Sequence, residues 1–270
     1  MVLQSAASPA FELPPRSTKP RRRGITSMID FGPDEMGWTG GERGIRDLLE
    51  VAADYIDYAK IYAMNALLIP AATLARTTRL YLDAGVTPFA GGILFEYAWQ
   101  RNEVDGMIAH LQRLAVPALE LSENYISLSD DERRRWIDHL QRAGLRVVYE
   151  FGRKNPEQPM SIDELGAVVA DVARQGIHHV TVEQSEIDML AAKNPGALGE
   201  LARETWFEDV LIEVDPYRFP QQHVQMIRDF GPEVSLANVA PGQVLRLEGF
   251  RRGVGRAVNY SIVSGPAQNA

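Results

Sequence analysis

Short apolar runs alternate with helix-like stretches along most of the chain. Each run is rich in β-branched or aliphatic residues and ends at a polar or charged residue, which is typical of a strand in a parallel sheet. The eight runs are Ile25–Phe31, Tyr55–Tyr62, Thr87–Gly91, Ala118–Glu123, Arg146–Gly152, His178–Gln184, Leu211–Asp215 and Ser235–Val239. Eight such units predict an α/β protein, a single closed (β/α)8 TIM barrel.

The stretches between the runs carry the apolar stripe of helices that cover a sheet. Counted from Ile45, the segment Glu42–Ala53 has apolar residues at positions i, i+3, i+4 and i+7. The segments Ala71–Ala84 and Glu132–Ala143 carry a similar apolar stripe. The pattern breaks within Asp188–Trp206, where Asn, Pro and Gly follow one another. We therefore expect the sixth loop of the barrel to be long and mobile.

The two ends of the chain lack this alternation. We expect the barrel to span residues 24–253, a flexible tail to span 1–23 and a C-terminal extension to span 254–270. The first segment holds a basic cluster of Lys19, Arg21, Arg22 and Arg23. The cluster is either a solvated lead-in to the first strand or a contact for a phosphate or a neighbouring subunit.

Composition narrows the class of function. The 270 residues have a formal net charge of -8, and a negatively charged protein does not attract nucleic acid through its overall electrostatic field. No apolar run is long enough to cross a membrane. The chain has no cysteine, so disulfides, thiolate nucleophiles and cysteine-ligated metals are excluded. These features favour a cytoplasmic enzyme acting on a small anionic substrate, with a homo-oligomer possible.

Polar and charged side chains gather where the predicted strands end. They are Asp30, Lys60, Glu96, Glu120, Glu123, Glu150, Glu183, Glu213, Asp215 and Asn238. Because an ionised group is costly to bury alone, so many acids at one end of a barrel predict a shared, cation-binding cavity. His178 and His179 are adjacent on a predicted strand and should point to opposite faces, which argues against a histidine zinc site.

These strand ends carry a family resemblance. The matching segments are GITSMID (24–30), DLLEVAADYIDYAK (47–60), AGGILFEYA (90–98), LELSE (119–123), YEFGRK (149–154), VE (182–183), IE (212–213), QQ (221–222), FGPEVSLANV (230–239) and LEGFRRG (247–253). In this order the chain resembles the phosphosulfolactate synthase family, barrel enzymes of coenzyme M biosynthesis. The resemblance implies a magnesium-dependent lyase that adds sulfite to phosphoenolpyruvate.

The resemblance also implies roles for individual residues. Catalytic roles fall on Lys154, Arg153 and Lys60. The expected ligands of Mg2+ are Glu120, Glu150, Glu183 and Glu213. Substrate binding falls on Asp30, Asn65, Glu96, Asn238, Asp215 and Gln184. The structural alternatives are ion pairs for Glu150 and Glu183, a salt bridge from Lys60 to Asp30, surface positions for Arg153 and Lys154, and helix capping by Asp215.

The chain departs from the family pattern in chemically relevant places. Phe31 and Gln184 stand where the family has cations, Asp215 adds an acid, and the segments 61–65 and 185–190 differ from the usual glycine-rich loops. Fewer cations favour a less anionic substrate or another nucleophile. A second alternative is a non-catalytic relative, similar to the stress-related plant members of the family.

Overall fold

The computed structural model describes residues 12–32, 41–194 and 196–264 and shows a closed barrel of eight parallel strands. The strands follow sequence order around the barrel, and β8 pairs with β1 to close it. Their bounds are β1 Thr26–Asp30, β2 Tyr58–Ile61, β3 Thr87–Ala90, β4 Ala118–Ser122, β5 Arg146–Phe151, β6 Val180–Val182, β7 Val210–Glu213 and β8 Ser235–Val239. The predicted (β/α)8 barrel is confirmed.

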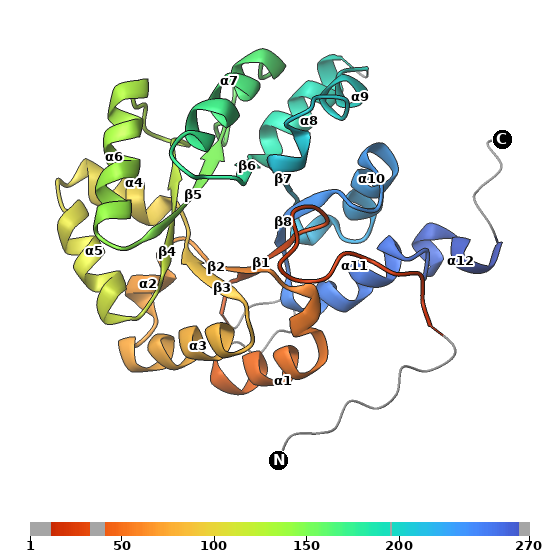
Figure 1. Ribbon diagram of the computed structural model, residues 1–270, viewed down its shortest axis with the longest axis horizontal. Coiled ribbons are helices and arrows are strands. Elements are labelled where there is room, and N and C mark those ends of the chain that lie inside the picture. The colour runs from red at the N-terminus through yellow and green to blue at the C-terminus, as the bar shows by residue number, and fades with distance from the viewer. Residues whose placement is uncertain (1–11, 33–40, 195, 265–270) are drawn as a thin grey trace.

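Helices surround the barrel (Figure 1). Their bounds are α1 Glu42–Ala52, α2 Asn65–Leu68, α3 Ala71–Asp83, α4 Ile93–Gln100, α5 Val104–Arg113, α6 Asp130–Arg142, α7 Ile162–Ala173, α8 Gln184–Lys193, α9 Ala197–Leu201, α10 Gln221–Phe230, α11 Val244–Arg251 and α12 Ser261–Ser264. Short 3-10 turns cover Ala53–Tyr55, Phe207–Asp209, Pro216–Arg218, Pro241–Gln243 and Arg256–Val258. Within the described ranges, none of the helices combines the length and apolar character that crossing a bilayer requires.

The strongest capping signals in the sequence start helices in the structure. Ser129 begins α6 with a reciprocal capping box to Glu132, and Ser161 accepts a hydrogen bond from the Glu164 N–H at the start of α7. The sixth βα segment differs from our expectation of a mobile loop, because α8 and α9 fill most of it. Ile187, Leu190 and the first and last residues of α9 are buried, and this packing outweighs the local helix breakers.

The described part of the N-terminal segment lies against the barrel, which differs from the expected flexible tail. Arg16 pairs with Glu233 at 2.6 Å and with Glu248 at 3.2 Å, and Arg252 donates to the Pro14 carbonyl at 2.9 Å. Arg16 is only 5% exposed. These contacts, which we call the N-terminal clasp, join residues 14–16 to the α10–β8 turn and to the α11 region. Residues 1–11 of the expected tail and 265–270 of the expected extension lie outside the described residues.

Candidate active site

The carboxyl ends of five strands bring four glutamates and two lysines together. Glu120 lies on β4, Glu150 on β5 and Glu213 on β7, Glu183 follows β6 directly, and Lys60 lies on β2. Lys154 comes from the loop after β5. All four glutamates are at most 3% exposed. We call these six residues the Glu4Lys2 cluster.

Lys60 lies at the buried centre of the cluster. Its Nζ is 2.8 Å from Glu120 Oε2, 3.6 Å from Glu213 Oε1 and 3.7 Å from Glu150 Oε2. Burial alone would lower the pKa of Lys60, but these three carboxylates raise it well above its ordinary value. Lys60 therefore stays charged and is held by the glutamates.

Lys154 closes the cluster from the solvent side. Its Nζ is 3.3 Å from Glu213 Oε2 and 3.5 Å from Glu150 Oε1, and it also donates to Glu183 Oε2. The side chain is 30% exposed, against 9% for Lys60. Burial opposes its charge, but the pKa of Lys154 is raised because Glu150, Glu213 and Glu183 outweigh that cost. A molecule entering the barrel mouth can therefore reach this ammonium group.

Three of the four carboxyls, those of Glu120, Glu150 and Glu183, have shifted pKa values. Burial, with Glu213 and Glu150 nearby, raises the pKa of Glu183 to about 10, and burial raises the pKa of Glu120 to about 8. Burial would also raise the pKa of Glu150, but Lys60 and Lys154 overcome it and hold that pKa near 2. At neutral pH Glu120 and Glu183 thus carry protons. These protons remove negative charge that the two lysines would otherwise leave uncompensated.

Neighbouring polar groups orient these carboxylates. The Gly92 N–H donates to Glu120 at 2.9 Å, Asn124 donates to Glu150 at 3.3 Å, and the Asn238 amide donates to Glu213. Among the described residues, Glu120 Oε1 and Asn238 Oδ1 are buried without a hydrogen-bond partner. One oxygen from each of Glu150, Glu183 and Glu213 lies within 4.8 Å of the others. Oxygen ligands so close together, with unpartnered oxygens beside them, suit a hard divalent cation such as Mg2+.

The other predicted residues make contacts of different kinds. Asp30 is buried and accepts hydrogen bonds from Tyr81 Oη and the Gly32 N–H. The Asn65 amide donates to the Phe31 carbonyl, and the Gln184 side chain donates to Asp188 on its own helix. Asp215 caps the turn Pro216–Arg218 by accepting from the Tyr217 N–H.

Two predicted residues hold loops in place. The guanidinium of Arg153 donates to Ser127 Oγ at 2.6 Å and belongs to an exposed side chain. Glu96 is buried in α4 and accepts from the N–H groups of Asn124 and Tyr125, both at 2.8 Å, and from Ser122 Oγ. Lys60 pairs with the cluster glutamates, whereas the alternative named Asp30 as its partner.

Sequence reasoning missed Asn124, which connects Glu96 to the cluster. Its backbone binds Glu96, and its side chain donates to Glu150 and to the Gly152 carbonyl at 3.0 Å. A search for charged residues at strand ends passes over a neutral amide. Its place directly after the acid-rich strand end 119–123 was the available signal.

A closed barrel with ionisable side chains converging at the carboxyl ends of its strands is the architecture of a (β/α)8-barrel enzyme. A family model described as (2R)-phospho-3-sulfolactate synthase (ComA) matches residues 14–256. The chain belongs to this family of enzymes.

Relatives across most of the chain agree with that assignment. The chain is 31% identical over 255 residues to the phosphosulfolactate synthase of Methanothermobacter thermautotrophicus, covering 90% of this chain and 94% of that protein. It is 24% identical over 252 residues to the phosphosulfolactate synthase of Bacillus subtilis, covering 91% and 96%. These identities fit a divergent member of the family.

Solved structures share the fold at lower identity. A dihydrodipicolinate synthase from Agrobacterium tumefaciens superposes with a TM-score of 0.52 at 13% identity, covering 90% of this chain and 78% of that one. An N-acetylneuraminate lyase from Fusobacterium nucleatum gives 0.50 at 16% identity over the same shares. Both similarities concern the fold alone.

Proposed function

We propose that the protein forms a carbon–sulfur bond by adding sulfite to phosphoenolpyruvate or to a less anionic relative of it. Family membership supports the class of reaction. The observation that carries the proposal is the Glu4Lys2 cluster at the barrel mouth, because it combines oxygen ligands for a hard cation with an accessible ammonium group. Neutral side chains at positions 31 and 184 support the less anionic relative.

The charge of the cluster supports a bound Mg2+. Four ionised glutamates and two protonated lysines leave a net charge of -2 (4 negative, 2 positive). Protons on Glu120 and Glu183 remove this charge in the metal-free protein, and one divalent cation would do the same. Glu150, Glu183 and Glu213 would hold the ion, with Glu120 beside them. When bound, it would stabilise negative charge developing on the substrate carboxylate.

The two lysines have different tasks in this proposal. Lys60 is buried between carboxylates and fixes their positions. Lys154 is partly exposed and protonated, so its Nζ can give a proton to the substrate carbon adjacent to the one that sulfite attacks. The new bond joins the sulfur to the methylene carbon, the electron pair of the double bond moves to the adjacent carbon, and that pair takes the proton.

Product formation tests the proposal. We expect wild-type protein supplied with Mg2+, sulfite and phosphoenolpyruvate, or a related enol acid with less charge, to form a sulfonated product that mass spectrometry detects. Lys154→Ala should abolish turnover, because general-acid catalysis contributes about 10²–10⁴-fold. Arg153→Ala, which removes a cation from the same loop, should have a smaller effect because Arg153 contacts Ser127. Loss in Arg153→Ala with activity kept in Lys154→Ala would move the proton donor to Arg153.

Calorimetry tests the metal site without activity. Glu150→Gln and Glu183→Gln should each weaken Mg2+ binding, since each replaces a carboxylate ligand with a neutral amide. Glu157→Gln is the matched control because Glu157 is exposed and lies on the loop that follows β5. Unchanged Mg2+ affinity in both cluster variants would exclude these two glutamates as ligands. Absence of product with every enol acid would favour the non-catalytic alternative.

A further inference from the structure

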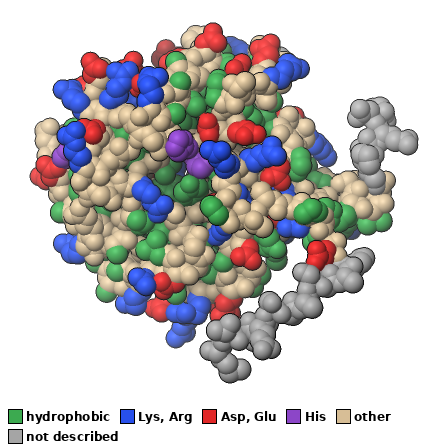
Figure 2. Space-filling model, in the orientation of Figure 1, with side chains coloured by type: hydrophobic (Ala, Val, Ile, Leu, Met, Phe, Trp, Pro, Cys, Tyr) green, Lys and Arg blue, Asp and Glu red, His purple; other side chains and the backbone are tan. Residues whose placement is uncertain are grey.

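A second cavity lies at the opposite end of the barrel from the Glu4Lys2 cluster. It has a volume of about 330 Å3 and is lined by residues at or just before the first positions of the strands, among them Tyr58, Thr87, Arg146 and His179. Figure 2 shows a histidine patch beside a hollow near the middle of the face turned to the viewer, with cationic side chains around it. This volume lies within the range of small-molecule sites.

Small side chains in the lowest layer of the barrel leave this space open. Barrel interiors are usually filled by layers of bulky branched side chains. Here Ser27, Ala118 and Thr181 line the cavity, so the layer does not close. The buried side chains of Phe89 and Leu211 give the cavity an apolar wall, which we call its floor.

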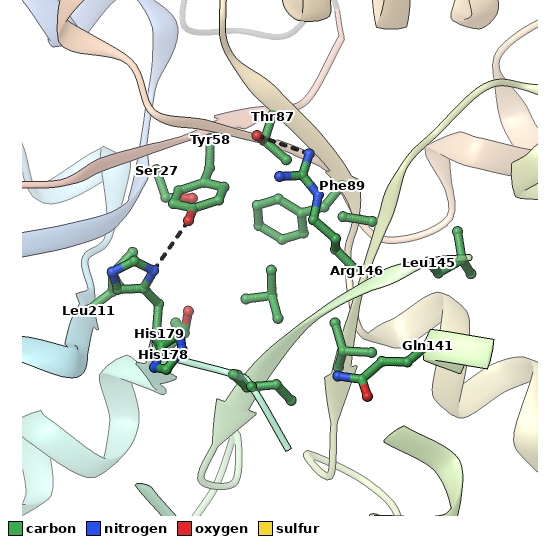
Figure 3. Close-up of a pocket in the computed structure, with 16 residues that line it drawn as sticks. Ser27, Tyr58, Thr87, Phe89, Gln141, Leu145, Arg146, His178, His179 and Leu211 are labelled. Carbon is green, nitrogen blue, oxygen red and sulfur yellow. Dashed lines mark hydrogen bonds between the residues drawn. The ribbon is translucent and has the colours of Figure 1, made fainter. Parts of the chain in front are cut away.

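The rim of the cavity is polar and cationic (Figure 3). Arg146 is exposed and donates to Thr87 Oγ1 at 3.3 Å, and among the described residues it has no ion-pair partner. On the other side, Tyr58 Oη and His179 Nδ1 are 3.2 Å apart. His178 lines the same cavity, because both histidines precede β6 rather than alternate along it. The expectation that both lie on a strand is wrong, because β6 begins at Val180.

The surrounding charges leave Arg146 open to an external anion. The charge of the Asp57 carboxylate helps to raise the pKa of Tyr58. This carboxylate is already bound by Arg21 at 3.0 Å and by the Thr26 N–H at 2.9 Å. Burial lowers the pKa of His179 and outweighs the opposing charge of Asp209. The His179 imidazole is therefore neutral at pH 7. Arg146 is therefore the cation at the rim that can pair with a ligand.

We propose that this cavity is a second binding site, for a small organic anion whose apolar body enters the amino-terminal end of the barrel while its carboxylate pairs with Arg146. The apolar floor excludes a fully hydrated ion, and the guanidinium at the rim selects an acid over a neutral molecule. The site is separate from the Glu4Lys2 cluster, since none of its lining residues belongs to the cluster.

Benzoate is a suitable probe because it combines one carboxylate with a compact apolar ring. We expect saturable benzoate binding to the wild-type protein by calorimetry. Arg146→Gln should weaken it about tenfold or more, as expected for loss of a charge-assisted hydrogen bond. Val148→Phe should weaken it by filling the cavity, since half-buried Val148 lines it. Benzyl alcohol should bind more weakly than benzoate, and inorganic phosphate should not compete.

Matched variants distinguish benzoate binding at Arg146 from binding at other cationic residues. Arg142→Gln removes a nearby exposed charge that pairs with Asp138 and should leave benzoate binding unchanged. Lys154→Ala should also leave it unchanged, because that residue lies at the other end of the barrel. The proposal is overturned if benzoate does not bind the wild type, if Arg146→Gln binds as the wild type does, or if Lys154→Ala alone abolishes binding. Each result is independent of turnover at the Glu4Lys2 cluster.

Discussion

Phe31 and Gln184 place two neutral side chains at the carboxyl ends of β1 and β6, where the family resemblance implies cations. Phe31 packs on Tyr62 with ring centroids 4.8 Å apart, and Gln184 donates to Asp188 at 3.1 Å. Neither side chain offers a positive charge to a phosphate or carboxylate. Under the proposed function, these two positions would limit how much negative charge a substrate can bring.

Restoring the two cations tests this effect of residue type. Phe31→Lys combined with Gln184→Arg should raise kcat/KM for phosphoenolpyruvate and sulfite by about 100-fold or more, if each new contact contributes about 1.5–3 kcal/mol. Product formation at fixed Mg2+ is the measurement. Abundant phosphosulfolactate from the unmodified protein, with no gain in the double variant, would contradict the argument for a less anionic substrate.

His223 is a second residue whose surroundings have a measurable effect. It is fully buried, and neither ring nitrogen has a partner among the described residues. Burial, with the nearby Arg251 guanidinium, lowers the pKa of His223 from 6.5 to about 3. Between these two pH values the unfolded chain binds a proton here and the folded protein does not. The free energy of unfolding therefore falls as pH decreases through this window, by up to about 1.4 kcal/mol per pH unit.

Chemical denaturation at a series of pH values measures this contribution. His223→Leu should lose stability less steeply than the wild type as the pH falls from 6.5 to 3. His178→Gln is the control, because that histidine is exposed. Parallel stability curves for the wild type and His223→Leu would show that His223 titrates normally in the folded protein.

At the scale of elements, sequence patterns predicted the strands better than the loops between them. Seven of the eight runs contain a whole strand and the run Leu211–Asp215 contains most of β7, because β-branched residues and polar ends give a strong local signal. The sixth βα segment differed because burial of Ile187 and Leu190 depends on packing that local residues do not reveal. The four glutamates and Lys60 lie together as their strand positions predicted, and Lys154 joins them from the loop after β5. The loop roles of Glu96 and Asn124 were missed, since they depend on contacts between separate loops.

Gly152 determines how the β5–α7 loop passes the cluster. Its φ is 112°, and a Cβ there would lie 2.5 Å from Glu186 Cγ and 3.0 Å from Glu183 Cβ. Gly152→Ala should therefore displace Glu183, weaken Mg2+ binding and destabilise the protein by about 1–3 kcal/mol from backbone strain alone. Calorimetry and thermal unfolding measure the two effects.

Gly144→Ala provides the matched comparison. Gly144 also has a positive φ, 86°, but a Cβ there would meet nothing within 4 Å. This variant should be destabilised by strain while keeping the Mg2+ affinity of the wild type. Equal Mg2+ affinity in both alanine variants would show that the loop can move without disturbing Glu183.

At the scale of the whole molecule, the cluster joins several strands, so an ion bound there should stabilise the closed barrel. At a Mg2+ concentration 100 times its Kd, binding to the folded state alone adds about 2.7 kcal/mol. For a domain of this size that corresponds to a rise in Tm of about 5–10 °C. Thermal scans with Mg2+ and with a chelator measure it, and Glu150→Gln should show a smaller rise. An unchanged Tm would contradict an ion held by several strands.

The N-terminal clasp has a consequence for how the protein is made. Arg16 and β1 are translated long before their partners Glu233, Glu248 and β8. β1 therefore has one open edge until β8 has been translated, and an exposed edge can pair with the wrong neighbour. Slow translation, or truncation before β8, should leave chains that need a chaperone.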